Sequence, residues 1–288
     1  MSEGILSAIH IHPVKGCRRV EVGAATVTGS GLAGDRHWQV VDAEGACVTQ
    51  RAEPLLATVE TALSGVDVIV SADGHGTATL SRAAGSQGQA TSLIGVRVEV
   101  TDAGDEAAGW VSGLLGAPHR FVAAPEDGYT PPPKIDQFGQ PITFVDLAPV
   151  LVANTASLDW LAKRANEPFG IERFRANLVI ETETPWAEDT WATATLGGAS
   201  LEFGLPWPRC AVPQIDQTSG ERRKEPAVVL KAHRWCDSTS LEGTLKRLVE
   251  GNALFGVSSA IGPEDAELRV GDQLTVTATK DPLLPSPA

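Results

Sequence analysis

Short stretches in which apolar and polar residues alternate recur along the whole chain. A period of two predicts β-strands that turn one face to a core and the other to solvent. Apolar residues at helical spacing occur at residues 105–115, which end before a glycine, and at residues 157–165. Many strands and few helices indicate a mainly β protein with some α (α+β), in which helices pack at the ends of a β-barrel. The predicted strands are residues 5–11, 20–28, 38–41, 46–49, 66–72, 93–100, 177–181, 199–203 and 273–278.

Three consecutive prolines at residues 131–133 mark the best candidate for a boundary between domains. Such a triplet favours extended polyproline geometry, which suits a linker, and a chain of 288 residues is long enough for about two domains. We therefore predict an N-terminal domain over residues 4–125 and a second domain over residues 135–279. Residues 280–288, which include three prolines, are predicted to form a loose C-terminal tail.

Composition and charge restrict the partners that this protein can have. The formal net charge is −13, and the acidic residues are spread over the whole chain. This balance argues against nucleic acid or an anionic membrane surface as the main partner, although a local group of arginines can still bind a small anion. The sequence has no apolar run long enough to span a bilayer, and its N-terminus lacks the pattern of a signal peptide. We expect a cytoplasmic protein that does not bind a membrane.

The cysteines, at positions 17, 47, 210 and 236, include no close pair, so neither a disulfide framework nor a CxxC metal site is indicated. Cys210 stands apart because it lies in the proline-framed segment Leu-Pro-Trp-Pro-Arg-Cys-Ala-Val-Pro, residues 205–213. Each proline fixes its φ and removes a backbone donor, so this segment is predicted to be a preformed loop rather than a helix or central strand. Arg209 beside the sulfur favours the thiolate, and Asp216 follows in the same loop. An unreactive buried cysteine is the common alternative, but this setting favours a reactive or metal-ligating thiol; residues 217–224 are expected to be mobile.

Several charged or amide residues lie beside predicted strands, where each has a structural and a functional interpretation. Lys15, close to a proline and followed by a glycine, belongs either to a solvated loop or to an anion site. Arg36 is either the ion-pair partner of its acidic neighbour or a ligand clamp. Arg175 and Asn177 alternate along a predicted strand, so their side chains should share one face. Burying these polar groups is costly unless they bind a ligand or take part in an internal ion pair. Asp146 enters a mostly apolar strand and would orient a ligand amine or pair with one of the arginines.

The order of the motifs along the chain is more informative than any one of them. The segments HPVKGC, GDRHW, VTQRAEP, RFRANLVIE, EDTW, PRCAVPQID and EPAVVLKAHR follow one another between about residues 5 and 278. This series resembles the molybdenum-cofactor sulfurase C-terminal (MOSC) superfamily, and most of all its members with an N-terminal MOSC β-barrel domain, the group that includes the mitochondrial amidoxime-reducing components. The resemblance implies a MOSC β-barrel core at residues 135–279 and a β-barrel-like MOSC N-terminal domain at residues 4–125.

The resemblance further implies a molybdopterin cofactor whose molybdenum binds a cysteine thiolate. The matching cysteine is Cys210, which would be both the metal ligand and a catalytic residue. Soft thiolates suit soft metal centres, and a cleft lined by lysine and arginine suits the phosphate of the cofactor. Two positions depart from the pattern, because Gly16 and Leu147 replace the small polar residues of many relatives. The implied cofactor-binding residues are Lys15, Arg36, Asp146, Arg175, Asn177 and Arg209.

The activity implied by the resemblance is a molybdenum-dependent reduction of small N-hydroxylated (N–O) compounds. The sequence has no cysteine cluster after Cys236 and no GxGxxG dinucleotide motif. Electrons are therefore expected from a separate electron-transfer protein of a ferredoxin- or flavin-type reductase system. Asp216, or water near it, is a candidate proton source and thus a second candidate catalytic residue. No membrane anchor is expected before the first strand, unlike in the mitochondrial relatives.

Two other functions are compatible with the sequence. The protein would be a molybdenum-cofactor or sulfur carrier if Cys210 held a persulfide, and metal analysis separates this alternative from the reductase. It would be a cysteine hydrolase if His233 served as the base for Cys210, which requires activity without any cofactor.

Overall fold

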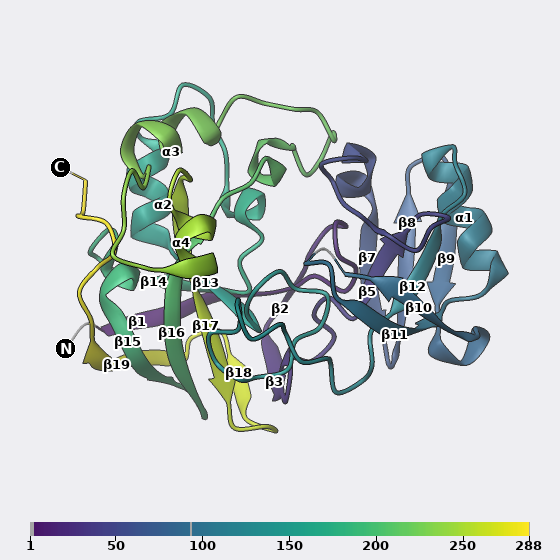
Figure 1. Cartoon of the computed structure of the whole chain (residues 1–288), viewed down its shortest axis with the longest axis horizontal. Coiled ribbons are helices and arrows are strands. Elements are labelled where there is room, and N and C mark those ends of the chain that lie inside the picture. Colours follow the sequence, from purple (N-terminus) through teal and green to yellow (C-terminus); the bar gives the residue numbers. More distant parts are fainter. Residues whose placement is uncertain (1–2, 93, 288) are drawn as a thin grey trace.

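The largest element of the fold is a closed β-barrel of seven strands (Figure 1). The structure is a computed structural model that describes residues 3–92 and 94–287. Apolar side chains such as Leu6, Val152 and Leu201, each at most 2% exposed, belong to its core. The predicted mainly β fold with a barrel core is confirmed. In pairing order the strands are β14 (Leu178–Glu181), β13 (Val150–Asn154), β17 (Leu254–Gly262), β16 (Ala199–Pro208), β15 (Trp191–Leu196), β19 (Gln273–Thr279) and β1 (Glu3–Ile11), and β1 also pairs with β14, which closes the ring.

The first strand of the chain belongs to this barrel together with strands from the second half of the sequence. β1 runs antiparallel to both β14 and β19, with Ile9 opposite Leu178. Its apolar residues Ile9 and Ile11 are buried, as the alternating pattern predicts. Leu6 is also buried, because the pairing with β14 shifts register between Leu6 and Ala8 and so changes the face that the earlier residues turn to the core. β2 (Val20–Val22) adds an eighth strand beside β1. The predicted division of the chain at residues 131–133 stays a prediction, and the hydrogen-bonded sheet crosses it at β1.

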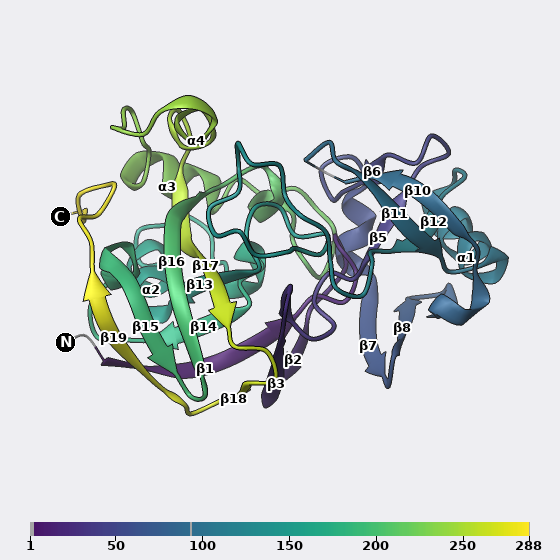
Figure 2. The same ribbon diagram turned by 60° about the horizontal axis from the view of Figure 1, so that its bottom comes forward.

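A smaller lobe, formed mainly by residues 38–123, lies beside the barrel in Figure 2. Helix α1 (Asp105–Leu115) packs there around a core that contains Trp38, Trp110 and Phe121. One sheet of this lobe joins β10 (Gln87–Thr91), β11 (Arg97–Asp102), β12 (Arg120–Ala123), β5 (Trp38–Val41) and β6 (Cys47–Val48), and another joins β7 (Glu60–Ser64), β8 (Asp67–Ala72) and β9 (Gly76–Leu80). A third small sheet joins β18 (Glu267–Arg269), β3 (Ala24–Thr28) and β4 (Gly31–Leu32).

Both predicted helices are present. α1 ends as predicted, because Gly116 adopts a left-handed conformation with φ +75°. α2 spans Thr155–Ala162 and begins earlier than predicted, since the side chain of Asn154 accepts a hydrogen bond from the amide of Ala156 at 3.0 Å and starts the helix there. In the described part of the chain, no helix is long and apolar enough to cross a membrane. The helices that were not predicted include α3 (Ala227–His233) and α4 (Gly243–Val249).

Most predicted strands are confirmed, and their bounds differ from the predicted ones in both directions. Residues 20–28 form two strands, β2 and β3, on either side of Gly23, and the strands predicted at residues 38–41 and 46–49 are β5 and β6, which pair as a hairpin. The strand predicted at residues 93–100 begins at Arg97, and Leu93 lies outside the described residues. A mostly apolar strand was expected after Asp146, but the bounds of β13 were not predicted, because all of its side chains are buried and its residues do not alternate.

Candidate functional site

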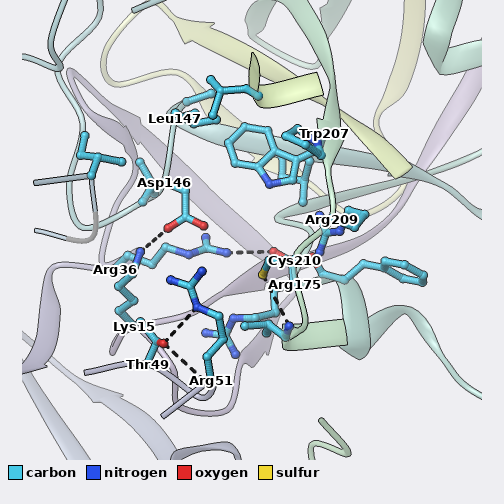
Figure 3. A pocket seen from close by; sticks show the side chains of 18 of the residues that line it. Lys15, Arg36, Thr49, Arg51, Asp146, Leu147, Arg175, Trp207, Arg209 and Cys210 are labelled. Carbon is cyan, nitrogen blue, oxygen red and sulfur yellow. Dashed lines mark hydrogen bonds and ion pairs between the residues drawn. The ribbon is translucent and has the colours of Figure 1, made fainter. Parts of the chain in front are cut away.

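A cavity of about 420 Å³ brings together side chains from widely separated segments of the chain (Figure 3). All predicted site residues except Asp216 line this cavity. The structure thus places Cys210 among several cationic side chains, and the roles of these residues in binding a ligand stay predictions. The predicted residues in the lining are Lys15, Arg36, Asp146, Arg175, Asn177, Arg209 and Cys210.

β16 carries the chain to Cys210. This strand runs as far as Pro208, so the prediction of a loop was wrong for the first part of the proline-framed segment. The prolines are accommodated because the pairing of β16 with β17 shifts register around Pro206 and Pro208, where the strand does not need a regular ladder of N–H donors. Directly after the strand, the amide of Arg209 donates to the carbonyl of Ala253 at 2.8 Å. This hydrogen bond fixes the backbone just before Cys210.

The cysteines differ in their accessibility. Cys210 is exposed, and its Sγ accepts a hydrogen bond from the amide of Val212 at 3.5 Å. Burial raises the pKa of Cys17 to about 12 and that of Cys47 to about 11, and Cys236 is fully buried. A cysteine acts as a metal ligand or nucleophile only as an accessible thiolate. Cys210 is therefore the cysteine best placed to react.

Two arginines at the cavity wall have donors without protein partners. Arg209 donates from Nη2 to the carbonyl of Phe174 at 2.8 Å, and its buried Nε and Nη1 have no partner among the described residues. Arg175 donates from Nη1 to the carbonyl of Cys17 at 2.7 Å, and its Nη2 is likewise unpaired within residues 3–92 and 94–287. Burial lowers the pKa of Arg209 to about 10 and that of Arg175 to about 9. Because unpaired buried donors are costly, both side chains indicate a site for an anion or another acceptor.

Arg36 has partners inside the protein. Its Nη1 donates to Asp35 at 2.5 Å and to Oδ1 of Asn177 at 3.1 Å, and its Nη2 donates to the carbonyl of Arg175 at 2.8 Å. Burial opposes ionisation of Asp35, but the nearby Arg36 outweighs it and holds the pKa of this carboxyl well below its usual range. Asn177 donates in turn to the carbonyl of His10 at 3.1 Å. Arg36 is therefore the ion-pair partner of Asp35 and also lines the cavity, and its role as a ligand clamp stays a prediction.

The backbone is left-handed at both Arg36 and Arg175, with φ of +50° and +57°. Residues with a side chain rarely adopt this conformation, and such strain tends to be kept at functional sites. Arg175 follows a short 3-10 helix, Ile171–Phe174, and β14 begins only at Leu178. The prediction that Arg175 and Asn177 alternate along a strand was therefore wrong. A turn, rather than strand alternation, directs Arg175 to the cavity.

Lys15, in the loop after β1, and Asp146, shortly before β13, form an ion pair at the cavity. The Nζ of Lys15 donates to Oδ1 of Asp146 and to the carbonyl of Phe144, the latter at 2.7 Å. Burial alone raises the pKa of Asp146, but the charge of Lys15 outweighs this effect and the pKa is lowered. The side chain of Asp146 is 41% exposed. Its observed partner is thus a lysine, where the sequence suggested an arginine or a ligand amine.

The lining also includes residues that the sequence analysis did not assign. Arg51 and Thr49 lie on the same side as Lys15, and Nε of Arg51 donates to Oγ1 of Thr49 at 3.5 Å (Figure 3). Trp207 and Leu147 lie at the opposite end (Figure 3). The sequence held a signal for both ends, because Arg51 stands in the segment VTQRAEP and Trp207 stands between two prolines. Other lining residues that were not assigned include Gln50, Leu151, Phe174, Arg247, Leu248 and Asn252.

A pair of buried amides lies beside these cations. Gln50 and Gln217 exchange two hydrogen bonds of 3.0 Å between their side chains. Gln50 also donates to the carbonyl of Gly16 at 2.6 Å, and Oε1 of Gln217 accepts from Nη1 of Arg175 at 3.4 Å. Gln217 is only 8% exposed. The expected mobility of residues 217–224 was therefore wrong for this residue.

Two residues with predicted chemical roles lie outside the cavity lining. Asp216 accepts hydrogen bonds from the amides of Thr218 and Ser219, each at 3.0 Å, and hydrogen bonding from the backbone keeps its pKa below the usual range. Its role as a proton source stays a prediction, which this placement does not favour. His233 packs edge-on against Trp160, with ring centroids 5.1 Å apart, and does not join Cys210 in the cavity lining.

Comparison with known proteins identifies both parts of the chain. The family model of the MOSC N-terminal beta barrel domain matches residues 3–118, and that of the MOSC domain matches residues 139–275. The chain is 30% identical over 282 residues to mitochondrial amidoxime reducing component 2 of Bos taurus, covering 93% of this chain and 82% of that protein. It is 29% identical over 285 residues to mitochondrial amidoxime-reducing component 1 of Homo sapiens, with the same two coverages. It is 29% identical over 247 residues to molybdenum cofactor sulfurase of Danio rerio, covering 77% of this chain and 29% of that protein.

The chain belongs to the MOSC superfamily, in the group whose members have an N-terminal MOSC β-barrel domain. This confirms the resemblance found in the ordered motifs. The match to the N-terminal domain begins at residue 3 and so includes β1, which in the structure completes the barrel built from the strands of the second match.

Proposed function

We propose that this protein binds a molybdopterin cofactor in the cavity, with Sγ of Cys210 as a ligand to the molybdenum, and that it reduces small N-hydroxylated compounds. The observation that carries the proposal is an exposed cysteine in a cavity where two arginines, Arg175 and Arg209, have donors without a partner among the described residues. A thiolate suits a soft metal centre, and guanidinium N–H groups suit phosphate oxygens. The names of the amidoxime-reducing relatives support the choice of N-hydroxylated substrates.

The residues of the lining fit this cofactor in charge and in hydrogen-bonding capacity. Lys15, Arg36 and Arg175 would bind its phosphate, and Arg209 would supply donors beside the thiolate. Asp146 would stay paired with Lys15 and keep its ammonium group in place. Asn177 would act on the site through Arg36, to which its Oδ1 is already hydrogen-bonded.

The proposed reaction converts an N–OH group into an N–H group and water, and it consumes two electrons and two protons. When bound, the molybdenum centre supplies the two-electron chemistry, while the protein binds and orients the cofactor and the substrate. The electrons would come from a separate electron-transfer protein of a ferredoxin- or flavin-type system. The cationic lining would hold the cofactor while Cys210 fixes the position of the metal.

Metal and pterin analysis of protein made in a host that synthesises the cofactor tests this proposal. We expect equimolar molybdenum and pterin in the native protein. Cys210→Ser should remove the protein sulfur from the X-ray absorption spectrum of the metal and lower reductase activity at least about a hundred-fold. Cys47→Ser, which alters a largely buried thiol outside the cavity lining, should keep both. Full activity in the Cys210 variant would contradict the site.

The electron supply gives an independent prediction. The isolated protein with NADH or NADPH alone should not reduce a hydroxylamine or an amidoxime, because the sequence has no dinucleotide-binding motif. Addition of a reduced viologen, or of a suitable redox protein, should start turnover. Steady-state turnover with NADPH and no other component would show that the chain has its own site for a reductant.

A sulfur-carrier function is the second candidate. It is favoured by the relative named molybdenum cofactor sulfurase and by the exposed thiol of Cys210, which also suits a persulfide. In that case the purified protein would contain little molybdenum, and cyanide would release thiocyanate from it. Molybdenum-loaded protein that fails with every reductant would also favour the carrier. The hydrolase alternative loses its support, because His233 does not line the cavity with Cys210.

A further inference from the structure

Trp207 and Leu147, at the end of the cavity opposite Lys15 (Figure 3), have no assigned role in holding the proposed cofactor. Trp207 and Leu147, both half-buried, lie at this end, and Cys210 lies between them and the cationic end (Figure 3). A substrate that approaches Cys210 would therefore meet apolar side chains on one side. Further apolar side chains of the lining are those of Ile94 and Leu248.

Arg247 belongs to a wall of the cavity that is joined to the end of β16. Asn252, in the turn between α4 and β17, donates from Nδ2 to the carbonyl of Leu248 at 3.1 Å. The next residue, Ala253, accepts the amide hydrogen bond from Arg209 at 2.8 Å. α4 is thus tied, through this turn, to the backbone that presents the cysteine.

The guanidinium of Arg247 is exposed and has no carboxylate within 4.0 Å in the part of the chain that the structure describes. It donates from Nη2 to Oγ1 of Thr244 at 3.1 Å. Its neighbour Lys246, by contrast, pairs with Glu250 at 3.6 Å. In a protein with a net charge of −13, a cavity cation without an acidic partner provides local attraction for an anionic ligand.

We propose that Arg247 is a specificity-determining residue: it binds the carboxylate of a substrate whose apolar part packs against Trp207 and Leu147 and whose N-hydroxyl group faces Cys210. This inference rests on the proposed reductase function. The planar guanidinium can donate two parallel hydrogen bonds to a carboxylate, and the indole ring adds a large apolar surface. The preferred substrates are therefore N-hydroxylated compounds that have both an apolar body and a carboxylate.

Benzamidoxime and its para-carboxy derivative are matched probes, since they differ only in the carboxylate. Reduced viologen drives the molybdenum-loaded protein, so that no protein partner enters the measurement. Wild-type protein should have the lower KM for the carboxylate compound. Arg247→Gln should raise the KM for the carboxylate compound relative to the KM for benzamidoxime about ten-fold, because one charge-assisted contact is lost. Lys246→Gln removes a charge one position away, outside the cavity lining, and should leave this ratio unchanged.

Charge reversal and direct binding sharpen the test. Arg247→Glu should favour the para-aminomethyl derivative of benzamidoxime, which is a cation, over the carboxylate compound. Calorimetric titration of the oxidised protein with the same compounds compares their affinities without turnover. If molybdenum-loaded wild-type protein reduces none of them, the proposed function fails. If wild-type protein and Arg247→Gln discriminate between the neutral and carboxylate compounds equally in binding, the assignment of Arg247 is overturned.

Discussion

Arginines that are largely buried beside the barrel fall into two sets. Arg234 represents the set with a carboxylate of its own, and Arg175 and Arg209 form the set without one. Arg234 is 1% exposed, its Nη2 donates to Asp189 at 2.5 Å, and its guanidinium lies 4.1 Å from the ring centre of Trp186. Its Nη1 has no partner among the described residues, but its charge is balanced by the carboxylate of Asp189. Arg175 and Arg209, at the cavity, donate to carbonyl and amide oxygens. Neither has an ion-pair partner among the described residues, and both have unpaired donors there.

This difference separates a structural charge from a functional one within the same fold. A buried guanidinium with its own carboxylate is compensated inside the protein, and loss of one member leaves the other charge buried and unpaired. A guanidinium with unpaired donors and no carboxylate of its own is compensated only when an anion binds. Substitution of Arg234 should therefore act mainly on the free energy of unfolding. Substitution of Arg175 or Arg209 should act mainly on ligand retention.

The largest effect is expected at the buried ion pair. Arg234→Met should lower the free energy of unfolding by about 3–5 kcal/mol, because it leaves the carboxylate of Asp189 buried without a partner. Urea unfolding of the cofactor-free protein measures this change. Adding Asp189→Leu should recover most of the loss, since both charges are then removed.

Arg269 provides the control for this experiment. It pairs with Glu267 at 2.7 Å on the surface, where the two side chains are 64% and 51% exposed. Arg269→Met should cost less than about 1 kcal/mol, because exposed ion pairs contribute little. An equal loss of stability in Arg234→Met and Arg269→Met would remove the distinction between the two sets of arginines.

The second largest effect is expected at the cavity. Arg209→Met should weaken cofactor retention by about 1.5–3 kcal/mol, or roughly ten- to a hundred-fold, because a charge-assisted hydrogen bond is lost. The stability of the cofactor-free protein should change by less than about 1 kcal/mol, since no carboxylate is left unpaired. Pterin content after gel filtration and urea unfolding measure the two quantities. Arg97→Met, on the exposed side of β11, should change neither, and pterin retention equal to that of Arg97→Met would contradict the role of Arg209.

Part of the fold could be predicted because strands with one solvated face alternate in polarity. The strand predicted at residues 273–278 was found at Gln273–Thr279, whose leucine and valine side chains turn to the core. The bounds of β13 could not be predicted, because both of its faces are covered and no alternating polar residues mark a solvent-facing side. The extension of β16 through Pro206 and Pro208 could not be predicted either, because it depends on register shifts in the pairing with β17, a strand distant in sequence.

The site could be predicted from motifs, but its internal contacts could not. The ordered segments singled out Lys15, Arg36 and Cys210, which the fold brings into one cavity. Their partners depend on tertiary structure, as in the ion pair of Lys15 with Asp146, a residue far along the chain. Arg247 has no motif around it, because its place in the lining depends on how α4 folds back toward the end of β16.

A buried carboxyl near the structural arginine extends the comparison to pH. Glu188 is fully buried, and its Oε2 accepts hydrogen bonds from Asn154 at 3.0 Å and Ser157 at 2.9 Å. Burial, reinforced by the neighbouring Asp189, raises the pKa of Glu188 from 4.5 to about 7. The native state therefore keeps a proton that the unfolded chain loses at lower pH. The stabilisation is fully present below the unfolded pKa and is lost as the pH rises through the native pKa.

Glu188→Gln should remove this pH dependence, because glutamine keeps an acceptor oxygen without a titrating proton. The measured quantity is the free energy of unfolding of the variant minus that of wild type. We expect this difference to be about 1–3 kcal/mol more positive at about pH 8 than at about pH 5. Urea unfolding at both pH values measures the difference. Glu99→Gln changes an exposed carboxyl of β11 and should keep the pH profile of the wild type. An unchanged profile in Glu188→Gln would show that this carboxyl is already ionised in the native state at the lower pH.

The smallest effect concerns how Arg175 is held in place. Where Arg234 has a carboxylate, Arg175 has a neutral amide, Oε1 of Gln217 at 3.4 Å, and this amide is held by two hydrogen bonds of 3.0 Å with Gln50. Neutral amides orient the guanidinium without cancelling its charge, so the charge stays available for an anion. The amide pair is therefore expected to tune cofactor retention through the position of Arg175.

Gln50→Ala should cost about 1 kcal/mol in stability and a few-fold in pterin retention, because the buried amide of Gln217 is left without its partner. Gln217→Ala should have a similar effect for the same reason. Since the two amides are hydrogen-bonded to each other, the double variant should lose less stability and less pterin retention than the sum of the losses in the single variants. Pterin dissociation rates of the four proteins complete this cycle. Additive losses would show that the amides act separately, and Arg175 would then be positioned by its left-handed backbone and the carbonyl of Cys17 alone.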